Sequence, residues 1–110
     1  MKEKTFEHKI RDFLKSNGCY VVKYFGCAYT KAGVPDLLTC VNGRFIAIEV
    51  KSDTGRPSEL QLVNIKQIQD AGGIAIVLYP KDWDKFKAFI ESILRTEYTA
   101  ELEARWRLIS

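Results

Sequence analysis

The feature that most constrains the fold is an asparagine–glycine pair between two extended apolar segments. Asn42-Gly43 is the usual signal for a two-residue hairpin turn, because both residues tolerate positive φ angles. We expect one strand over residues 35–41 and another over residues 44–51. A two-residue turn also sets the register of these strands, and it places Asp36 directly opposite Glu49.

This register predicts a pair of carboxylates on one face of the hairpin. The even-numbered residues of 46–50 are apolar and form the core face, so Glu49 and Lys51 face away from the core. Opposed carboxylates repel each other unless a cation lies between them. Oxygen ligands suit Mg²⁺, for which Mn²⁺ can substitute. The sequence therefore predicts a metal site formed by Asp36, Glu49 and the main-chain carbonyl of Val50.

Such a site suits the hydrolysis of a phosphodiester. A divalent cation would supply the Lewis acid for this reaction, and the Lys51 ammonium would stabilise the negative charge that develops on the phosphate oxygens. The alternative is a weak surface ion pair, because an acidic and a basic residue two positions apart are common on exposed strand faces. The Pro35-Asp36 pair at the opposed position favours the catalytic interpretation.

Helical and extended patterns alternate along the rest of the chain. We expect helices over residues 5–16, from the Ser58 cap to Ala71-Gly72-Gly73, and from Asp82 onward, and further strands over residues 19–25 and 74–79, the last one buried on both faces. The second helix carries the apolar residues Leu60, Val63, Ile65 and Ile68, among others. Residues 99–110 suit either a short helix or an edge strand. The order α-β-β-β-α-β-α predicts an α/β fold with a mixed central sheet flanked by helices.

Composition limits the class of protein. A chain of 110 residues with 46% apolar and 28% charged residues predicts one globular domain over residues 1–110. No apolar run approaches the roughly 20 residues that a membrane helix needs, and the charged N-terminus does not resemble a signal peptide, so we expect a cytoplasmic protein without membrane contact. The net charge of +3 is compatible with nucleic acid but does not argue for it. The three cysteines, Cys19, Cys27 and Cys40, are expected to be reduced and packed as small apolar residues.

The motifs also resemble those of a known superfamily. Pro35-Asp36 followed by Glu49-x-Lys51 resembles the PD-(D/E)xK nuclease signature, which implies a restriction-endonuclease-like core. The string continues after Lys51 as Ser-x-x-Gly-Arg-Pro-Ser-x-x-Gln61, and it looks like that of the stand-alone virus-type replication-repair (VRR-NUC) nucleases of phages and bacteria. These proteins are similar to Holliday junction resolvases in fold and pairing. The resemblance implies metal ligation by Asp36 and Glu49 and catalysis by Lys51.

Two further residues acquire candidate roles from this resemblance. It implies that Gln61, at the start of the second helix, supports catalysis by orienting water or a phosphate; the alternative is an ordinary polar helix residue. It also implies a metal-ligating glutamate from the first helix, for which Glu7 is the best candidate. Glu7 borders the inward stripe of that helix, but it is equally suited to be an exposed acid favoured by the helix dipole.

Basic and aromatic residues surround the predicted site in sequence. Candidate DNA contacts are Lys23, Lys31, Arg44, Arg56 and Lys66 for phosphates and Tyr29 for stacking on a base. Lys31 and Arg56 are the strongest of these because each lies within a few residues of a catalytic candidate. No helix-turn-helix or other base-reading module is present, so recognition of DNA structure is favoured over recognition of sequence.

These observations predict a metal-dependent endonuclease that acts on branched DNA such as Holliday junctions or flaps. The alternatives are a sequence-specific restriction-type endonuclease and a non-catalytic nucleic-acid-binding subunit on a nuclease fold. Symmetric cleavage of a four-way junction needs two sites, which a twofold homodimer would supply. Leu102, Trp106 and Ile109 are candidate dimer contacts, unless they close the core of the monomer.

Overall fold

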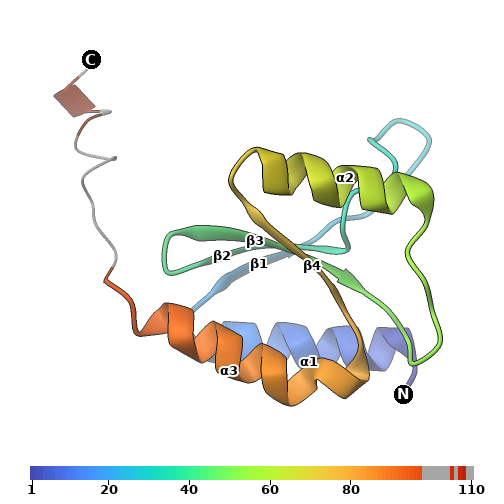
Figure 1. Cartoon of the computed structure of the whole chain (residues 1–110), viewed down its shortest axis with the longest axis horizontal. Helices are drawn as coiled ribbons and strands as arrows, with labels where there is room; N and C mark the ends of the chain where they lie inside the picture. Colours follow the sequence, from blue (N-terminus) through green and yellow to red (C-terminus); the bar gives the residue numbers. More distant parts are fainter. Residues whose placement is uncertain (98–104, 106, 109–110) are drawn as a thin grey trace.

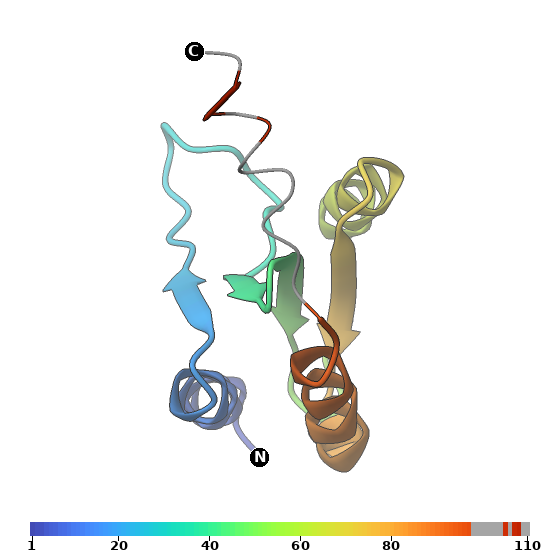
Figure 2. The ribbon, with the colours of Figure 1, turned by 90° about the vertical axis from the view of Figure 1, so that its left-hand side faces the viewer.

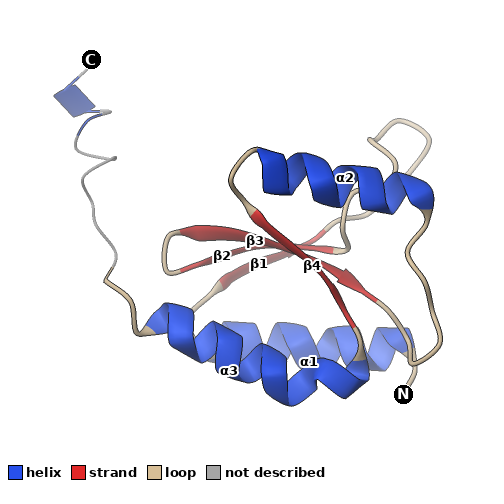
Figure 3. Cartoon of the chain, viewed as in Figure 1, coloured by secondary structure: helices blue, strands red, loops and turns tan. Residues whose placement is uncertain are grey.

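The computed structural model describes residues 1–97, 105, 107 and 108. Its elements are α1 (Glu3–Ser16), β1 (Tyr20–Lys23), β2 (Leu37–Val41), β3 (Arg44–Val50), α2 (Glu59–Asp70), β4 (Ile74–Leu78), a 3₁₀ turn (Pro80–Asp82) and α3 (Trp83–Leu94). Their order is the predicted α-β-β-β-α-β-α, and the strands form one mixed sheet between helices (Figures 1 and 3). No helix in this part of the chain is long and apolar enough to cross a membrane.

The sheet has the strand order β1-β2-β3-β4. The first three strands form an antiparallel meander, and β4 lies parallel to β3 after the crossover through α2. Helices α1 and α3 cover one face of the sheet, and α2 covers the other (Figures 1 and 2). The loop between β1 and β2 rises on the same side of the sheet as α2.

The hairpin turn has the predicted geometry. Asn42 and Gly43 have φ angles of 47° and 82°, as a two-residue turn with two positive φ angles requires. The register of β2 and β3 pairs Val41 with Arg44 and Leu37 with Ile48. Continuing this register by one residue places Asp36 opposite Glu49, as predicted from the turn.

Both faces of β3 are covered, but by layers of different size. Ile46, Ile48 and Val50 join the main core under α1 and α3, as the alternation of the strand predicts. On the other face, Ala47 packs with Ile65 in a smaller core beneath α2. The face that carries Glu49 thus points away from the main core, as predicted, and α2 lies over it.

The expectation that β4 is buried on both faces is wrong in part. β4 is an edge strand rather than a central one, and only Ala75 and Leu78 among its five residues are buried. In α2, Leu60 and Val63 are about half exposed. The helix instead turns the polar Asn64 inward next to Ile65, because the inner surface of α2 faces a loop and a polar site as well as the sheet.

Other local differences concern caps and thiols. Asp82 occupies the position before α3 but makes no side-chain cap, and the 3₁₀ turn leads into the helix instead. All three cysteines are free, as expected, but only Cys19 is buried, so the predicted packing is wrong for Cys27 and Cys40. Leu102, Trp106 and Ile109 lie outside the described residues, and so does most of the segment 99–110.

The loop before β2 is held against α2 by a close backbone approach at Gly33. The Asn64 side chain of α2 donates to the carbonyls of Ala32 and Leu60, at 3.3 and 2.9 Å. Gly33 has a φ of +81°, and a Cβ there would lie 2.7 Å from Asn64 Nδ2 and from Leu60 Cγ. Only glycine fits this position. The contact fixes the segment that leads into Asp36.

We predict that Gly33→Ala destabilises the protein far more than Gly18→Ala. Both glycines have positive φ angles, but a Cβ at Gly18 meets nothing within 4 Å. Gly18→Ala should therefore cost only about 1 kcal/mol of backbone strain, whereas Gly33→Ala should cost about 3 kcal/mol because it adds a clash with α2. Urea unfolding measures the difference, and equal losses would show that the loop is not clamped.

Candidate active site

Asp36 and Glu49 meet where β2 begins and β3 ends. Asp36 lies immediately before β2, and its Oδ2 accepts the main-chain N–H of Val50 at 2.8 Å. Its own carbonyl accepts the N–H of Tyr24 at 2.8 Å, which ties it to the end of β1. These bonds hold the Asp36 carboxylate beside the backbone of β3. The predicted pair of opposed carboxylates is therefore present.

The Glu49 carboxylate is buried and only partly paired. Glu49 is 1% exposed because α2 lies over it. Its Oε2 accepts from Gln61 Nε2 at 3.0 Å and lies 3.3 Å from Lys51 Nζ. Its Oε1 is the one buried side-chain nitrogen or oxygen without a hydrogen-bond partner in the described part of the chain. A buried carboxylate oxygen without a donor is costly unless something else satisfies it.

The environment also disturbs the ionisation of Glu49. Burial, together with the neighbouring Asp36 carboxylate, raises the pKa of Glu49 from 4.5 to about 7 against the opposing effect of Lys51. One lysine thus does not neutralise the two carboxylates. A second positive charge near Asp36 and Glu49 would reduce the repulsion between the two carboxylates.

Gln61 is held in place by the cap of α2. Ser58 Oγ accepts the main-chain N–H of Gln61, and Gln61 Oε1 accepts the N–H of Ser58, at 3.1 and 2.8 Å. This is a complete capping box. Because the Oε1 end of the amide is engaged by Ser58, the Nε2 end points at Glu49. The structure thus places the Gln61 amide against Glu49, and its role in orienting water or a phosphate stays a prediction.

The backbone of Val50 adds a further oxygen. Its N–H points at Asp36, and the N–H and C=O of one strand residue point to the same side. The Val50 carbonyl therefore lies on the Asp36 side of β3, and its role as a metal ligand stays a prediction. Asp36, Glu49 and this carbonyl form an all-oxygen set, the chemistry that Mg²⁺ or Mn²⁺ prefers. The unpaired Glu49 Oε1 is the observation that fits a cation.

Glu7 is buried, but it makes a different set of contacts. It forms an ion pair with Lys23 and lies 3.8 Å from Arg11. Within the described residues, no group of three acidic, histidine or cysteine side chains gathers closely enough to hold an ion. Glu7 therefore does not form a cluster with Asp36 and Glu49. Because Glu7 is buried, the alternative of an exposed acid is wrong. The role of Glu7 as a metal ligand stays a prediction.

Of the five basic residues predicted to contact DNA, two lie near the site and three pair with other groups. Lys31 donates to Gln67 of α2 at 3.3 Å, and Arg56 is exposed on the loop after β3, so both remain near the site elements. The other three basic residues are engaged elsewhere: Lys23 with Glu7, Arg44 with the carbonyl of Asn42, and Lys66 with Asp70.

Tyr29 is presented at the tip of the β1–β2 loop. It is 98% exposed. The turn that carries it is closed by a bond from the N–H of Thr30 to the carbonyl of Cys27, and the Tyr24 hydroxyl donates to the carbonyl of Lys31. The aromatic ring is therefore exposed on a loop anchored beside Asp36, and its stacking on a base stays a prediction.

Sequence reasoning missed three residues that support the site. Ser58 was expected only as a helix cap, whereas its backbone also aims Gln61 at Glu49. Gly33 and Asn64 join the Asp36 segment to α2. The Ser-x-x-Gln spacing is itself a capping-box signal, so the contribution of Ser58 was accessible from the sequence. The contact between Gly33 and Asn64 was not, because it joins segments 31 positions apart.

These features define the class of the protein. A mixed sheet between helices, with an acidic residue before the second strand and Glu-x-Lys at the end of the third, is the restriction-endonuclease-like fold of the PD-(D/E)xK nucleases. The family model of the archaeal Holliday junction resolvases (Hjc) matches residues 1–100. The chain belongs to this family, whose members are nucleases of the PD-(D/E)xK type. A comparison with curated proteins finds no match.

Membership of this family implies an endonuclease that acts on Holliday junctions. The predicted superfamily and fold are thus confirmed. The more specific assignment to the VRR-NUC branch stays a prediction.

We predict an unusual pH dependence of stability. Because the pKa of Glu49 is raised to about 7 in the folded protein, its stabilising contribution is complete below pH 4.5 and is lost as the pH rises through 7. Glu49→Gln mimics the protonated acid. In EDTA at pH 8, this variant should therefore unfold at a higher urea concentration than the wild type, with a gain of at most about 3 kcal/mol.

The same substitution at Glu91, which is exposed on α3, is the matched control. Glu91→Gln should leave the stability difference between pH 4 and pH 8 as it is in the wild type. If Glu49→Gln proves less stable than the wild type at pH 8 in EDTA, the ionised Glu49 carboxylate does not destabilise the folded protein.

Proposed function

We propose that this protein is a Mg²⁺- or Mn²⁺-dependent endonuclease that hydrolyses phosphodiester bonds in branched DNA. The observation that carries the proposal is the buried Glu49 carboxylate, which faces Asp36, contacts Lys51 and keeps one oxygen unpaired. A purely structural glutamate would have both oxygens satisfied or would be exposed. Family membership supports a Holliday junction as the substrate.

Each residue of the site has a distinct role in this proposal. Asp36, Glu49 and the Val50 carbonyl would hold the ion, which when bound supplies Lewis-acid activation of the phosphodiester and of a water molecule. Lys51 lies against Glu49 with its side chain 12% exposed, so its charge is held beside the acidic pair, where it would stabilise negative charge that develops on the phosphate. Gln61 fixes Glu49 Oε2, which leaves Oε1 for the ion.

Recognition of branched DNA would rest on shape. The β1–β2 loop with Tyr29 and Lys31 and the loop with Arg56 border the site, and a stacked Tyr29 would favour an unpaired or unstacked base at a branch point. No base-reading module is present in the described part of the chain, which disfavours the restriction-type alternative. The complete set of Asp36, Glu49 and Lys51 disfavours a non-catalytic subunit.

The finer assignments follow from the same residues. The string from Gly33 to Gln61 supports the VRR-NUC branch. Because two cuts in one junction require two copies of the site, we include a homodimer in the proposal. A DNA substrate of this kind supports a location in the cytoplasm.

We predict that cleavage depends on the acidic pair and on the lysine. With four-way junction, flap and linear duplex DNA, the wild type should cut the branched substrates in Mg²⁺ or Mn²⁺ but not in EDTA. Asp36→Asn should lower the cleavage rate by about 10³-fold, because it weakens the hold on the ion. Lys51→Ala should lower it by about 10²-fold, because it removes a positive charge that would stabilise the transition state. Single-turnover cleavage of end-labelled DNA measures both rates.

Asp70→Asn is the control, because Asp70 is an exposed acid at the far end of α2. Its rate should equal that of the wild type. A wild type that binds junctions yet cuts none of them with either metal would show that the protein is not a nuclease, and cutting that survives Asp36→Asn would place the site elsewhere.

We also predict that Lys31 and Arg56 make salt-dependent contacts to DNA phosphates. Replacing both by alanine should weaken binding to every DNA and reduce the slope of log K against log salt by about 2, because each phosphate contact contributes about 1. Lys87→Ala is the control, since Lys87 lies on α3 beside Asp84, across the sheet from α2. An unchanged slope in the double variant would remove these residues from the DNA interface. Fluorescence anisotropy over a salt series gives the slopes.

A further inference from the structure

The face of the sheet that carries Glu49 is only partly covered. Helix α2 packs its small core over β3 and β4, and the same face stays open near the hairpin turn. The register of the first three strands places Tyr20, Cys40 and Phe45 in one row across β1, β2 and β3. Tyr20 is 68% exposed, and Cys40 is exposed as well. An accessible apolar row therefore crosses the sheet beside the turn.

This row ends in a pocket of about 430 Å³ between the start of β3 and the end of α2. Its lining includes Arg44, Phe45, Ile68, Ala71, Gly72 and Gly73. Gly73 makes room for the Phe45 ring, because a Cβ at this glycine would lie 3.1 Å from Phe45 Cδ2. The ring therefore packs on the backbone of Gly73, while the residue stays 45% exposed. It forms a flat, accessible wall of the pocket.

The pocket also carries a positive charge that no salt bridge neutralises in the described part of the chain. Arg44 is the one charged residue of the lining, and no acidic side chain pairs with it there. Its Nη1 donates to the carbonyl of Asn42 at 2.7 Å, which leaves other N–H groups of the guanidinium for a ligand. At the opposite rim the chain leaves α2 through Ala71 and Gly72. Backbone carbonyls at the end of a helix lack helical partners, so they can accept from an amino group.

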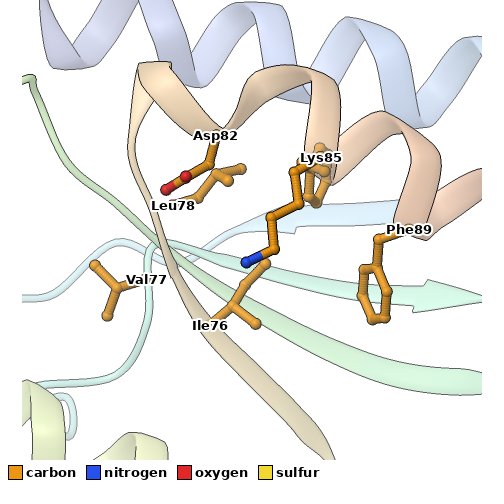
Figure 4. Close-up of a pocket in the computed structure, with 7 residues that line it drawn as sticks. Ile76, Val77, Leu78, Asp82, Lys85 and Phe89 are labelled. Carbon is orange, nitrogen blue, oxygen red and sulfur yellow. The ribbon is translucent and has the colours of Figure 1, made fainter.

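A pocket of about 260 Å³ between β4 and α3 differs from this one in charge (Figure 4). Its lining holds both Asp82 and Lys85, and the Lys85 side chain extends toward Ile76. The two opposite charges leave it without the net positive charge that attracts an anion. An anionic ligand is therefore suited to the pocket at Phe45 and not to the pocket at Lys85.

We propose that the pocket at Phe45 binds one unpaired nucleotide of the DNA strand, with the base against the Phe45 ring and a phosphate on Arg44. A nucleotide has a flat ring that stacks on an aromatic side chain, a negative phosphate, and in most bases an exocyclic amino group. These three features match the aromatic wall, the guanidinium and the free carbonyls. An apolar peptide would leave the charge of Arg44 unused.

This inference rests on the proposed function and adds a second point of contact to it. Phe45 and Glu49 lie on the same face of β3, and the four residues between these positions correspond to about 13 Å of strand. A base in the pocket would therefore lie a few nucleotides from the bond held at the acidic pair. Linear duplex has no unpaired base to place there. The pocket would thus favour branched DNA that exposes a nucleotide at this distance from the cut.

Binding in EDTA tests the pocket without cleavage. The probes are a flap DNA with a single-stranded arm and a linear duplex of the same length. Phe45→Leu keeps an apolar contact with Gly73 but removes the ring, so it should weaken flap binding about tenfold and leave duplex binding unchanged. Phe45→Trp keeps a ring and should bind the flap at least as tightly as the wild type.

The charge is tested in the same assay. Arg44→Ala should reduce the slope of log K against log salt by about 1 for the flap, because one phosphate contact is lost. Arg95→Ala is the matched control, since Arg95 is an exposed arginine at the end of α3, across the sheet from α2. Its slope should equal that of the wild type.

Photocrosslinking locates the bound base. When 5-iodouracil replaces the bases of the arm one at a time, one position should crosslink to Phe45, as mass spectrometry of the crosslinked peptide would show. Three results would overturn the inference: a wild type that binds flap and duplex equally, a Phe45→Leu variant that binds the flap as tightly as the wild type, and crosslinks to Tyr29 with none to Phe45.

These measurements separate the pocket from the proposed function. A wild type that cuts flaps, together with a Phe45→Leu variant that binds them unchanged, would contradict the pocket alone. A protein that crosslinks an unpaired base at Phe45 but cuts no DNA with either metal would contradict the proposed function alone.

Discussion

The burial of the Glu49 carboxylate is the constraint around which the other parts of the site are organised. Placing a charged group between a sheet and a helix costs several kcal/mol unless partners compensate for the lost water. Lys51 and Gln61 satisfy one of its oxygens, and the other remains unpaired beside Asp36. The protein therefore stores an electrostatic penalty at one point, and a divalent cation is the simplest group that would relieve it.

Helix α2 holds both parts of the acidic site in place. Its first turn orients Glu49 through the capping box of Ser58 and Gln61, and its second turn holds the Asp36 segment through Asn64 and Gly33. One helix thus controls both carboxylates. This explains why α2 buries the polar Asn64: its inner surface serves a polar site as well as a small core.

Much of the arrangement followed from local patterns. The Asn42-Gly43 turn sufficed to predict the register and hence the opposition of Asp36 and Glu49, because a two-residue turn leaves no freedom in the pairing. Ser58 was correctly predicted as a helix cap. The edge position of β4 was not predictable, because an apolar run does not reveal how many neighbours a strand will have. The ion pair of Glu7 with Lys23 was not predictable either, because it joins two separate elements of the fold.

The sequence by itself determined the element order, the hairpin register and the presence of an acidic pair with a lysine, since each depends on residues close together along the chain. Only the tertiary structure decided that Glu49 is buried under α2, that Gly33 touches Asn64, and that β4 ends the sheet. These features arise from contacts between segments distant in sequence. Alternation shows which way a side chain points, but not what will be packed against it.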